Sequence, residues 1–203
     1  TQNSLNSFRI VAFGDSLVDV GHVGRVDANN SNTKYRYTVN QVETATAFNI
    51  GTTFIEAIAR FFGFGTVSYA LDSLTAGRLP SAGAYSYGEF GALVSGAAGT
   101  NDARGCTKVA GTATAYCAYN LQAQIDLFLA QGAPSSNDLF VISIGTGDIM
   151  ATGIRNLTIN AAGVTAGLDD VKTDLATAGV STTMQAAANA LAEQIKRLTD
   201  AGA

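Results

Sequence analysis

The chain has 203 residues, of which 47% are hydrophobic and only 14% are charged, and its formal net charge is −4. This composition excludes a disordered chain, which needs low hydrophobicity and high net charge. The 12 basic residues argue against a nucleic-acid partner, because a phosphate backbone needs clustered Lys and Arg. No apolar run reaches the roughly 18 residues of a membrane-spanning helix, and the length favours one domain over residues 1–203. One His and two Cys form no cluster with metal-ligand spacing, so the sequence predicts no metal and no cofactor.

The first half of the chain begins with a predicted strand over residues 8–13, a nearly continuous apolar run typical of a parallel strand buried on both faces. The run stops at Gly14-Asp15-Ser16. Further on, Thr53 and Glu56 have the spacing of a capping box, which predicts a helix that ends near Gly63. The pattern then predicts a strand over residues 66–71, a long loop over residues 72–92 and a short strand over residues 92–95.

The second half contains the two clearest elements. Asn120 is placed to cap a helix through Ala130, and residues 138–144 predict a second buried strand. The segment from Thr182 to residue 200 predicts an amphipathic helix with an apolar face of Met184, Ala188, Leu191, Ile195 and Leu198. Alternating strands and helices predict an α/β fold with a mostly parallel sheet. We expect three or four strands, fewer than a doubly wound sheet usually has, so the sheet is predicted to be incomplete.

Two cysteines, Cys106 and Cys117, lie eleven residues apart in a segment rich in Gly, Thr and Ala. In an oxidising compartment a disulfide between them would stabilise the fold by about 3 kcal/mol, whereas in the cytosol they would be free thiols. We favour the disulfide and, with it, a secreted or periplasmic location. The start at Thr1 rather than Met fits a mature protein after signal removal, or simply a chosen boundary.

Polar clusters follow the two strongest strands, at the edge of a parallel sheet where ligands bind. Gly14-Asp15-Ser16 follows the first strand, and residues 145–148, Gly-Thr-Gly-Asp, follow the later one. A serine in such a turn can act as a nucleophile, with neighbouring N–H groups stabilising an oxyanion. Taken alone, the tripeptide is better explained as a turn that caps a helix.

The longer stretch from Ile10 to Gly21 reads IVAFGDSLVDVG and resembles the first sequence block of the GDSL (SGNH) hydrolases. The resemblance continues in order along nearly the whole chain, through residues 93–97, 120–129, 138–141 and 191–203. It is nearest to the secreted bacterial lipase, esterase and acyltransferase branch. The resemblance implies a flavodoxin-like three-layer α/β/α sandwich and an ester or acyl-lipid substrate.

By that resemblance Ser16 is the nucleophile, and the oxyanion donors are the N–H groups of Ser16 and Gly96 and an Asn side chain in the third block. This chain has Gly147 where the family has that Asn, and loss of one donor costs about 10²–10³ in rate. Asn101, in a Gly-Thr-Asn-Asp string, is an alternative donor.

Two acidic residues and two tyrosines lie near these blocks. Asp15 and Asp148 can be interpreted as an acid/base pair, although we favour a structural role as acceptors of hydrogen bonds from the glycine loops. Tyr85 and Tyr87 are candidates to line an acyl pocket or simply to pack in the long loop.

The family's last block, an Asp and a His three residues apart, has no counterpart here. The single histidine, His22, lies six residues beyond Ser16 and is an alternative base. The missing base and the missing strand predict that the chain is the N-terminal two-thirds of a GDSL hydrolase, with a C-terminal fragment as its partner supplying Asp and His. The alternative is a non-catalytic secreted binding or structural protein with a degenerate GDSL fold.

Overall fold

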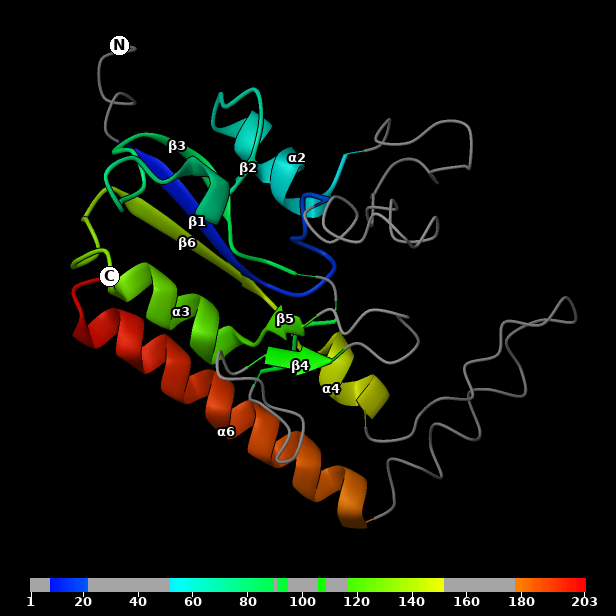
Figure 1. The fold of residues 1–203 in the computed structure, drawn as a ribbon. Coiled ribbons are helices and arrows are strands. Elements are labelled where there is room, and N and C mark those ends of the chain that lie inside the picture. The colour runs from blue at the N-terminus through cyan, green and yellow to red at the C-terminus, as the bar shows by residue number, and fades with distance from the viewer. Residues whose placement is uncertain (1–7, 22–51, 90, 95–105, 109–116, 152–177) are drawn as a thin grey trace, which may run out of the picture.

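The computed structural model describes residues 8–21, 52–89, 91–94, 106–108, 117–151 and 178–203 (Figure 1). Its main sheet has four strands in the order β2-β3-β1-β6, and every neighbouring pair is parallel. The strands are β1 (Arg9–Gly14), β2 (Ser68–Tyr69), β3 (Gly83–Ser86) and β6 (Asp138–Ser143). The predicted α/β fold with a mostly parallel sheet is therefore confirmed.

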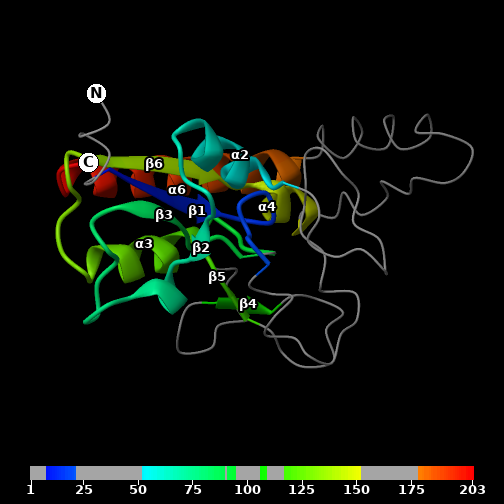
Figure 2. The ribbon, with the colours of Figure 1, turned by 90° about the horizontal axis from the view of Figure 1, so that it is seen from above.

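Strand β1 is an inner strand of the sheet, because it pairs with β3 on one side and with β6 on the other. Its alternate side chains enter two separate clusters of buried residues. Ile10 and Ala12 pack with Ile55 and Ala59 of helix α2 (Phe54–Phe61), whereas Val11 and Phe13 belong to the cluster that contains residues of α3 (Leu121–Leu129) and α6 (Ala178–Asp200). Figures 1 and 2 show the result, with α2 on one face of the sheet and α3 and α6 on the other.

The second cluster is built around aromatic rings. Phe13 stacks on Tyr87 with ring centroids 5.3 Å apart and meets Phe128 edge-on at 5.7 Å, and both are favourable arrangements. Tyr85 lies in β3 and Tyr87 follows it, and both are buried. The two tyrosines are therefore core residues rather than residues of a long loop.

Two helix starts follow directly from the sequence. Thr53 accepts the amide of Glu56 while the Glu56 carboxylate accepts the Thr53 amide, so the predicted capping box is confirmed. Asn120 accepts the amide of Ala123 and caps α3 as predicted. Both caps satisfy amide groups that have no partner within their helix.

The segment between residues 66 and 95 differs from the prediction. Strand β2 is only Ser68–Tyr69, and a 3-10 turn, η2, follows at Leu71–Ser73. The predicted loop over residues 72–92 is wrong, because it contains β3, an inner strand of small and aromatic residues that lacks an apolar run. Residues 92–94 do not form the predicted short strand. A two-stranded antiparallel hairpin of β4 (Cys106–Lys108) and β5 (Cys117–Tyr119) was not predicted.

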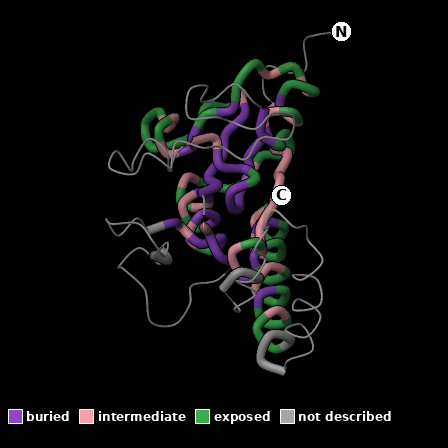
Figure 3. The backbone as a smooth tube through the Cα atoms, turned by 90° about the vertical axis from the view of Figure 1, so that its right-hand side faces the viewer, coloured by how far each residue is buried: buried purple, intermediate pink, exposed green. Residues whose placement is uncertain are grey.

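The C-terminal elements of the structure also differ from the prediction. Helix α6 begins at Ala178, four residues before the predicted start. Its buried positions are Ala187, Gln194 and Leu198, whereas Ile195 is 45% exposed, so the face is rotated from the predicted one. Strand β6 is half-buried rather than buried (Figure 3), because it is the edge of the sheet and no strand of the described residues pairs with its outer side.

A search of the described helices for a membrane span found none of sufficient length and hydropathy.

Candidate active site

The end of β1 is fixed against the end of β6. Gly14 pairs with Ser143 in the parallel register, and the Asp15 amide donates to the Ser143 carbonyl at 3.0 Å. Gly14 has φ of +147°, and a Cβ at this position would lie 1.8 Å from the Ser143 oxygen. Only glycine fits here, because any side chain would collide with the backbone of β6.

Asp15 to Asp19 form one tight turn in which nearly every amide has a partner. The amides of Val18 and Asp19 donate to the Asp15 carbonyl at 3.2 and 3.1 Å. The Leu17 amide donates to Asp15 Oδ1 at 3.3 Å. Ser16, at the centre of this turn, is only 7% exposed.

Ser16 is the exception within this turn. Neither its N–H nor its hydroxyl makes a hydrogen bond to another described residue. A polar group without a partner in a buried position costs free energy unless it meets water or a ligand. The turn therefore presents one donor and one hydroxyl, from the same residue, at the carboxyl end of the central strand.

The Asp15 carboxylate joins the loops that follow β1 and β6. Its Oδ1 accepts the Leu17 amide, and its Oδ2 accepts the Thr146 amide at 3.2 Å. Burial raises the pKa of Asp15, and the amide hydrogen bonds from Leu17 and Thr146 oppose that rise. These contacts fix the Ser16 turn relative to the loop after β6, which begins helix α4 (Thr146–Ala151).

Asp148, in the first turn of α4, contacts a different segment. Its carboxylate accepts the Val94 amide at 3.0 Å (Oδ2) and 3.3 Å (Oδ1). Burial raises its pKa, and the negative charge of Asp15 adds to the rise. The two carboxylates are thus close enough to influence one another, yet each has its own set of amide donors.

Gly147 lies where α4 packs tightly on residues 92–93. A Cβ on Gly147 would be 2.8 Å from the Ala92 carbonyl oxygen and 2.9 Å from Leu93 Cδ2. An Asn at this position would collide with the backbone of Ala92, so the structure has no room for the side-chain donor that the third block of the family provides. The glycine therefore has a packing reason to be here.

Gln124 of α3 is a site residue that the sequence patterns did not single out for a role. The side chain is fully buried, and its Oε1 accepts the Gly14 amide at 2.8 Å. Its Nε2 donates to the carbonyls of Gly14 at 2.9 Å and Tyr119 at 2.8 Å. One amide group thus holds the residue two positions before Ser16 on both its N–H and its carbonyl. A polar residue on the apolar face formed by Leu121, Ile125 and Phe128 was the available signal.

Glu89 is a second buried residue of this region that the patterns missed. Its amide donates to the Gly14 carbonyl at 3.1 Å. Its carboxylate accepts the Tyr69 hydroxyl at 2.5 Å and the Tyr119 amide at 2.8 Å. Burying a carboxylate is costly unless it is well hydrogen-bonded. Glu89 meets that condition and ties β2, β5 and the end of β1 together.

Three predicted residues lie outside the described residues. They are the oxyanion donor Gly96, the alternative donor Asn101 and the alternative base His22. Of the predicted site residues, the structure brings together Ser16, Asp15, Gly147 and Asp148 at the adjacent ends of β1 and β6.

The backbone of the β4–β5 hairpin bears on the predicted disulfide. Cys106 lies opposite Tyr119 and Cys117 lies opposite Lys108, so the cysteines are diagonal neighbours. Diagonal Cα atoms are about 7–8 Å apart, whereas a disulfide usually needs about 4.4–6.8 Å. The bond would require a shift of this register. The side chains of both cysteines lie outside the described part of the structure, and the disulfide stays a prediction.

Among the described residues, no group of three or more His, Cys, Asp or Glu side chains is arranged to hold a metal ion. No protein-family model matches the sequence, and no curated protein matches it either.

Proposed function

We propose that this chain is a serine ester hydrolase of the GDSL type with Ser16 as its nucleophile. The observation that carries the proposal is that Ser16 is buried while its N–H and its hydroxyl have no hydrogen-bond partner among the described residues. The amides of its neighbours in the turn, by contrast, all donate hydrogen bonds. A nucleophile and an oxyanion donor are two of the groups that acyl transfer requires, and Ser16 offers both.

The proposed reaction has two steps. The Ser16 Oγ attacks the ester carbonyl carbon and forms a new C–O bond, and the carbonyl oxygen becomes an oxyanion that accepts the Ser16 N–H. The intermediate collapses, the alcohol leaves with the proton taken from Ser16, and an acyl-enzyme remains. Water or a second alcohol then releases the acyl group and regenerates Ser16. The substrate is an ester or acyl lipid.

The proton of Ser16 needs a base, and no base contacts its hydroxyl in the described part of the chain. Following the family resemblance, we propose that an Asp and a His on a further segment complete the site, and that the segment pairs with the outer edge of β6. The whole would then be a flavodoxin-like α/β/α sandwich, in a secreted or periplasmic protein. His22 is the alternative base within this chain.

A second candidate function is a non-catalytic binding or structural protein with the same fold. The packing around Gly147 favours it, since that packing leaves no room for the third oxyanion donor. The two candidate functions predict different effects of replacing Ser16: the hydrolase would lose ester hydrolysis, whereas the binding protein would show no change in it.

Hydrolysis of p-nitrophenyl butyrate by wild type, S16A and the exposed-serine control S81A tests the proposal. Because no described residue acts as a base at Ser16, we expect little turnover without imidazole. With imidazole added as a surrogate base, we expect turnover above the protein-free imidazole rate in wild type and S81A, and none above that rate in S16A. Equal rates for wild type and S16A, with and without imidazole, would refute the hydrolase and leave the binding protein.

A further inference from the structure

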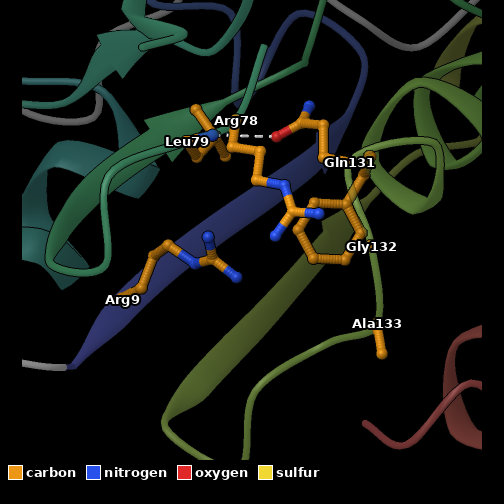
Figure 4. Close-up of a pocket in the computed structure, with 7 residues that line it drawn as sticks. Arg9, Arg78, Leu79, Gln131, Gly132 and Ala133 are labelled. Carbon is orange, nitrogen blue, oxygen red and sulfur yellow. Dashed lines mark hydrogen bonds between the residues drawn. The ribbon is translucent and has the colours of Figure 1, made fainter. Parts of the chain in front are cut away.

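A cavity of about 180 Å³ lies at the amino-terminal end of the sheet (Figure 4). Its lining includes Arg9, Arg78, Leu79, Phe128 and Gln131. Arg9 is the first residue of β1 and Gly14 is the last, so the cavity and the Ser16 turn are at opposite ends of the same strand. The cavity is therefore separate from the candidate active site.

The ion pair between Arg9 and Asp138 engages only part of the Arg9 guanidinium group. Its Nε donates to Asp138 Oδ1 at 2.8 Å, and its Nη2 donates to Asp138 Oδ2 at 2.5 Å. Its guanidinium carbon lies 5.6 Å from the centre of the Phe128 ring, within the range of a cation–π contact. The remaining nitrogen, Nη1, makes no hydrogen bond to the residues that the structure describes. Nη1 of Arg9 thus retains both of its N–H donors.

Arg78 is held firmly by its backbone but not by its side chain. Its N–H and carbonyl both pair with Thr75, at 3.1 and 2.7 Å, and the next amide, that of Leu79, donates to Gln131 Oε1 at 3.0 Å. The guanidinium lies 3.8 Å from where a Cβ on Gly132 would be. It forms no ion pair or hydrogen bond with any described residue, and the residue is exposed. Figure 4 shows the Arg9 and Arg78 guanidinium groups extending from different elements into the same space.

The remaining polar groups around the cavity are already satisfied or neutral. Gln131 Nε2 donates to the Tyr87 hydroxyl and the Leu127 carbonyl, and its Oε1 accepts the Leu79 amide. Burial raises the pKa of Tyr87 to about 12, so this phenol is neutral at ordinary pH. The lining therefore holds two guanidinium groups and no carboxylate. Asp138 balances the charge of Arg9, so the charge of Arg78 is left without a counter-charge among the described residues.

We propose that Arg78, together with Nη1 of Arg9, binds a small oxyanion, carried by a carboxylate or a phosphate group. The planar guanidinium offers paired N–H donors that match both anions. At about 180 Å³ the cavity is smaller than the roughly 300–1,000 Å³ of pockets for drug-sized ligands. It therefore suits the anionic group alone or a short molecule that bears it.

The test is calorimetric titration of the full chain with inorganic phosphate and, separately, with acetate, at a constant ionic strength set with NaCl. The variants are R78Q and R60Q, since Arg60 is an exposed arginine on α2, away from the cavity. We expect saturable binding of at least one anion, weakened about tenfold or more in R78Q and within about twofold of wild type in R60Q. R78K, which keeps the charge but loses the planar fork, should bind with intermediate affinity.

The two titrations also separate the sources of the anion. Binding of phosphate alone assigns the site to phosphate groups, and binding of acetate alone assigns it to carboxylates. No saturation with either anion, or R78Q binding as tightly as wild type while both have the same circular dichroism spectrum, would overturn the proposal.

Discussion

Replacing Gln124 with leucine should destabilise the protein. The substitution Q124L keeps the size of a fully buried side chain and removes its three hydrogen bonds, two to Gly14 and one to Tyr119. The Gly14 carbonyl retains the Glu89 amide at 3.1 Å. The Gly14 N–H and the Tyr119 carbonyl are then left without their side-chain partner in the interior.

Each unsatisfied buried group costs about 1–3 kcal/mol, and burial of the leucine recovers part of that cost. We expect the free energy of unfolding to fall by about 2–4 kcal/mol, which for a chain of this length lowers the melting temperature by about 5–15 °C. The measurement is urea denaturation of wild type, Q124L and Q185L. Gln185 is exposed on α6 and hydrogen-bonds only to Asn189 in the described residues, so Q185L should change stability by less than about 0.5 kcal/mol. A Q124L protein as stable as Q185L would refute the role of Gln124 in holding the end of β1.

Three further substitutions test other contacts of the fold and the site. G147A should cost about 1–3 kcal/mol, because its Cβ would meet the Ala92 carbonyl at 2.8 Å, whereas G65A, which meets nothing within 4 Å, should be neutral or slightly stabilising; equal effects in thermal unfolding would contradict the packing argument. Burial raises the folded-state pKa of Asp148 above 3.8, so the protonated form is favoured by folding, and the stability that this group contributes is present below pH 3.8 and lost as the pH rises through its folded-state pKa. As the pH rises above 3.8, wild type should therefore lose stability relative to D148N, which has no carboxyl group to titrate at this position. A difference in unfolding free energy between D148N and wild type that does not change with pH would contradict the raised pKa. T53A removes the cap and one half of the capping box of α2 and should cost about 1 kcal/mol in urea denaturation, whereas no loss would mean that packing of Ile55 and Ala59 alone holds the helix.

The elements with strong local signals could be predicted from the sequence. The apolar runs of β1 and β6 and the caps at Thr53 and Asn120 each carry a signal within a few residues. Strand β3 could not be predicted in this way, because Gly83 to Ser86 has neither an apolar run nor strict alternation, and its strand conformation comes from pairing with β1 and β2.

The same distinction applies to the candidate site. The position of Ser16 after a buried strand was readable from the sequence, since the Gly-Asp-Ser turn is local. The contacts of Gln124 with Gly14 join residues 110 positions apart, and no local pattern encodes them. The same is true of Gly147, whose tight fit depends on Ala92 and Leu93 lying against α4.

Covalent labelling of Ser16 tests the central proposal most directly. A fluorophosphonate probe would be incubated with the full chain and with S16A, each with and without imidazole, and the site of modification located by peptide mass spectrometry. We predict an adduct on Ser16 in the wild type, formed faster with imidazole because the described residues place no base at its hydroxyl, and no adduct at this position in S16A. A wild-type protein that carries no adduct on Ser16 under either condition would contradict the assignment of Ser16 as a nucleophile.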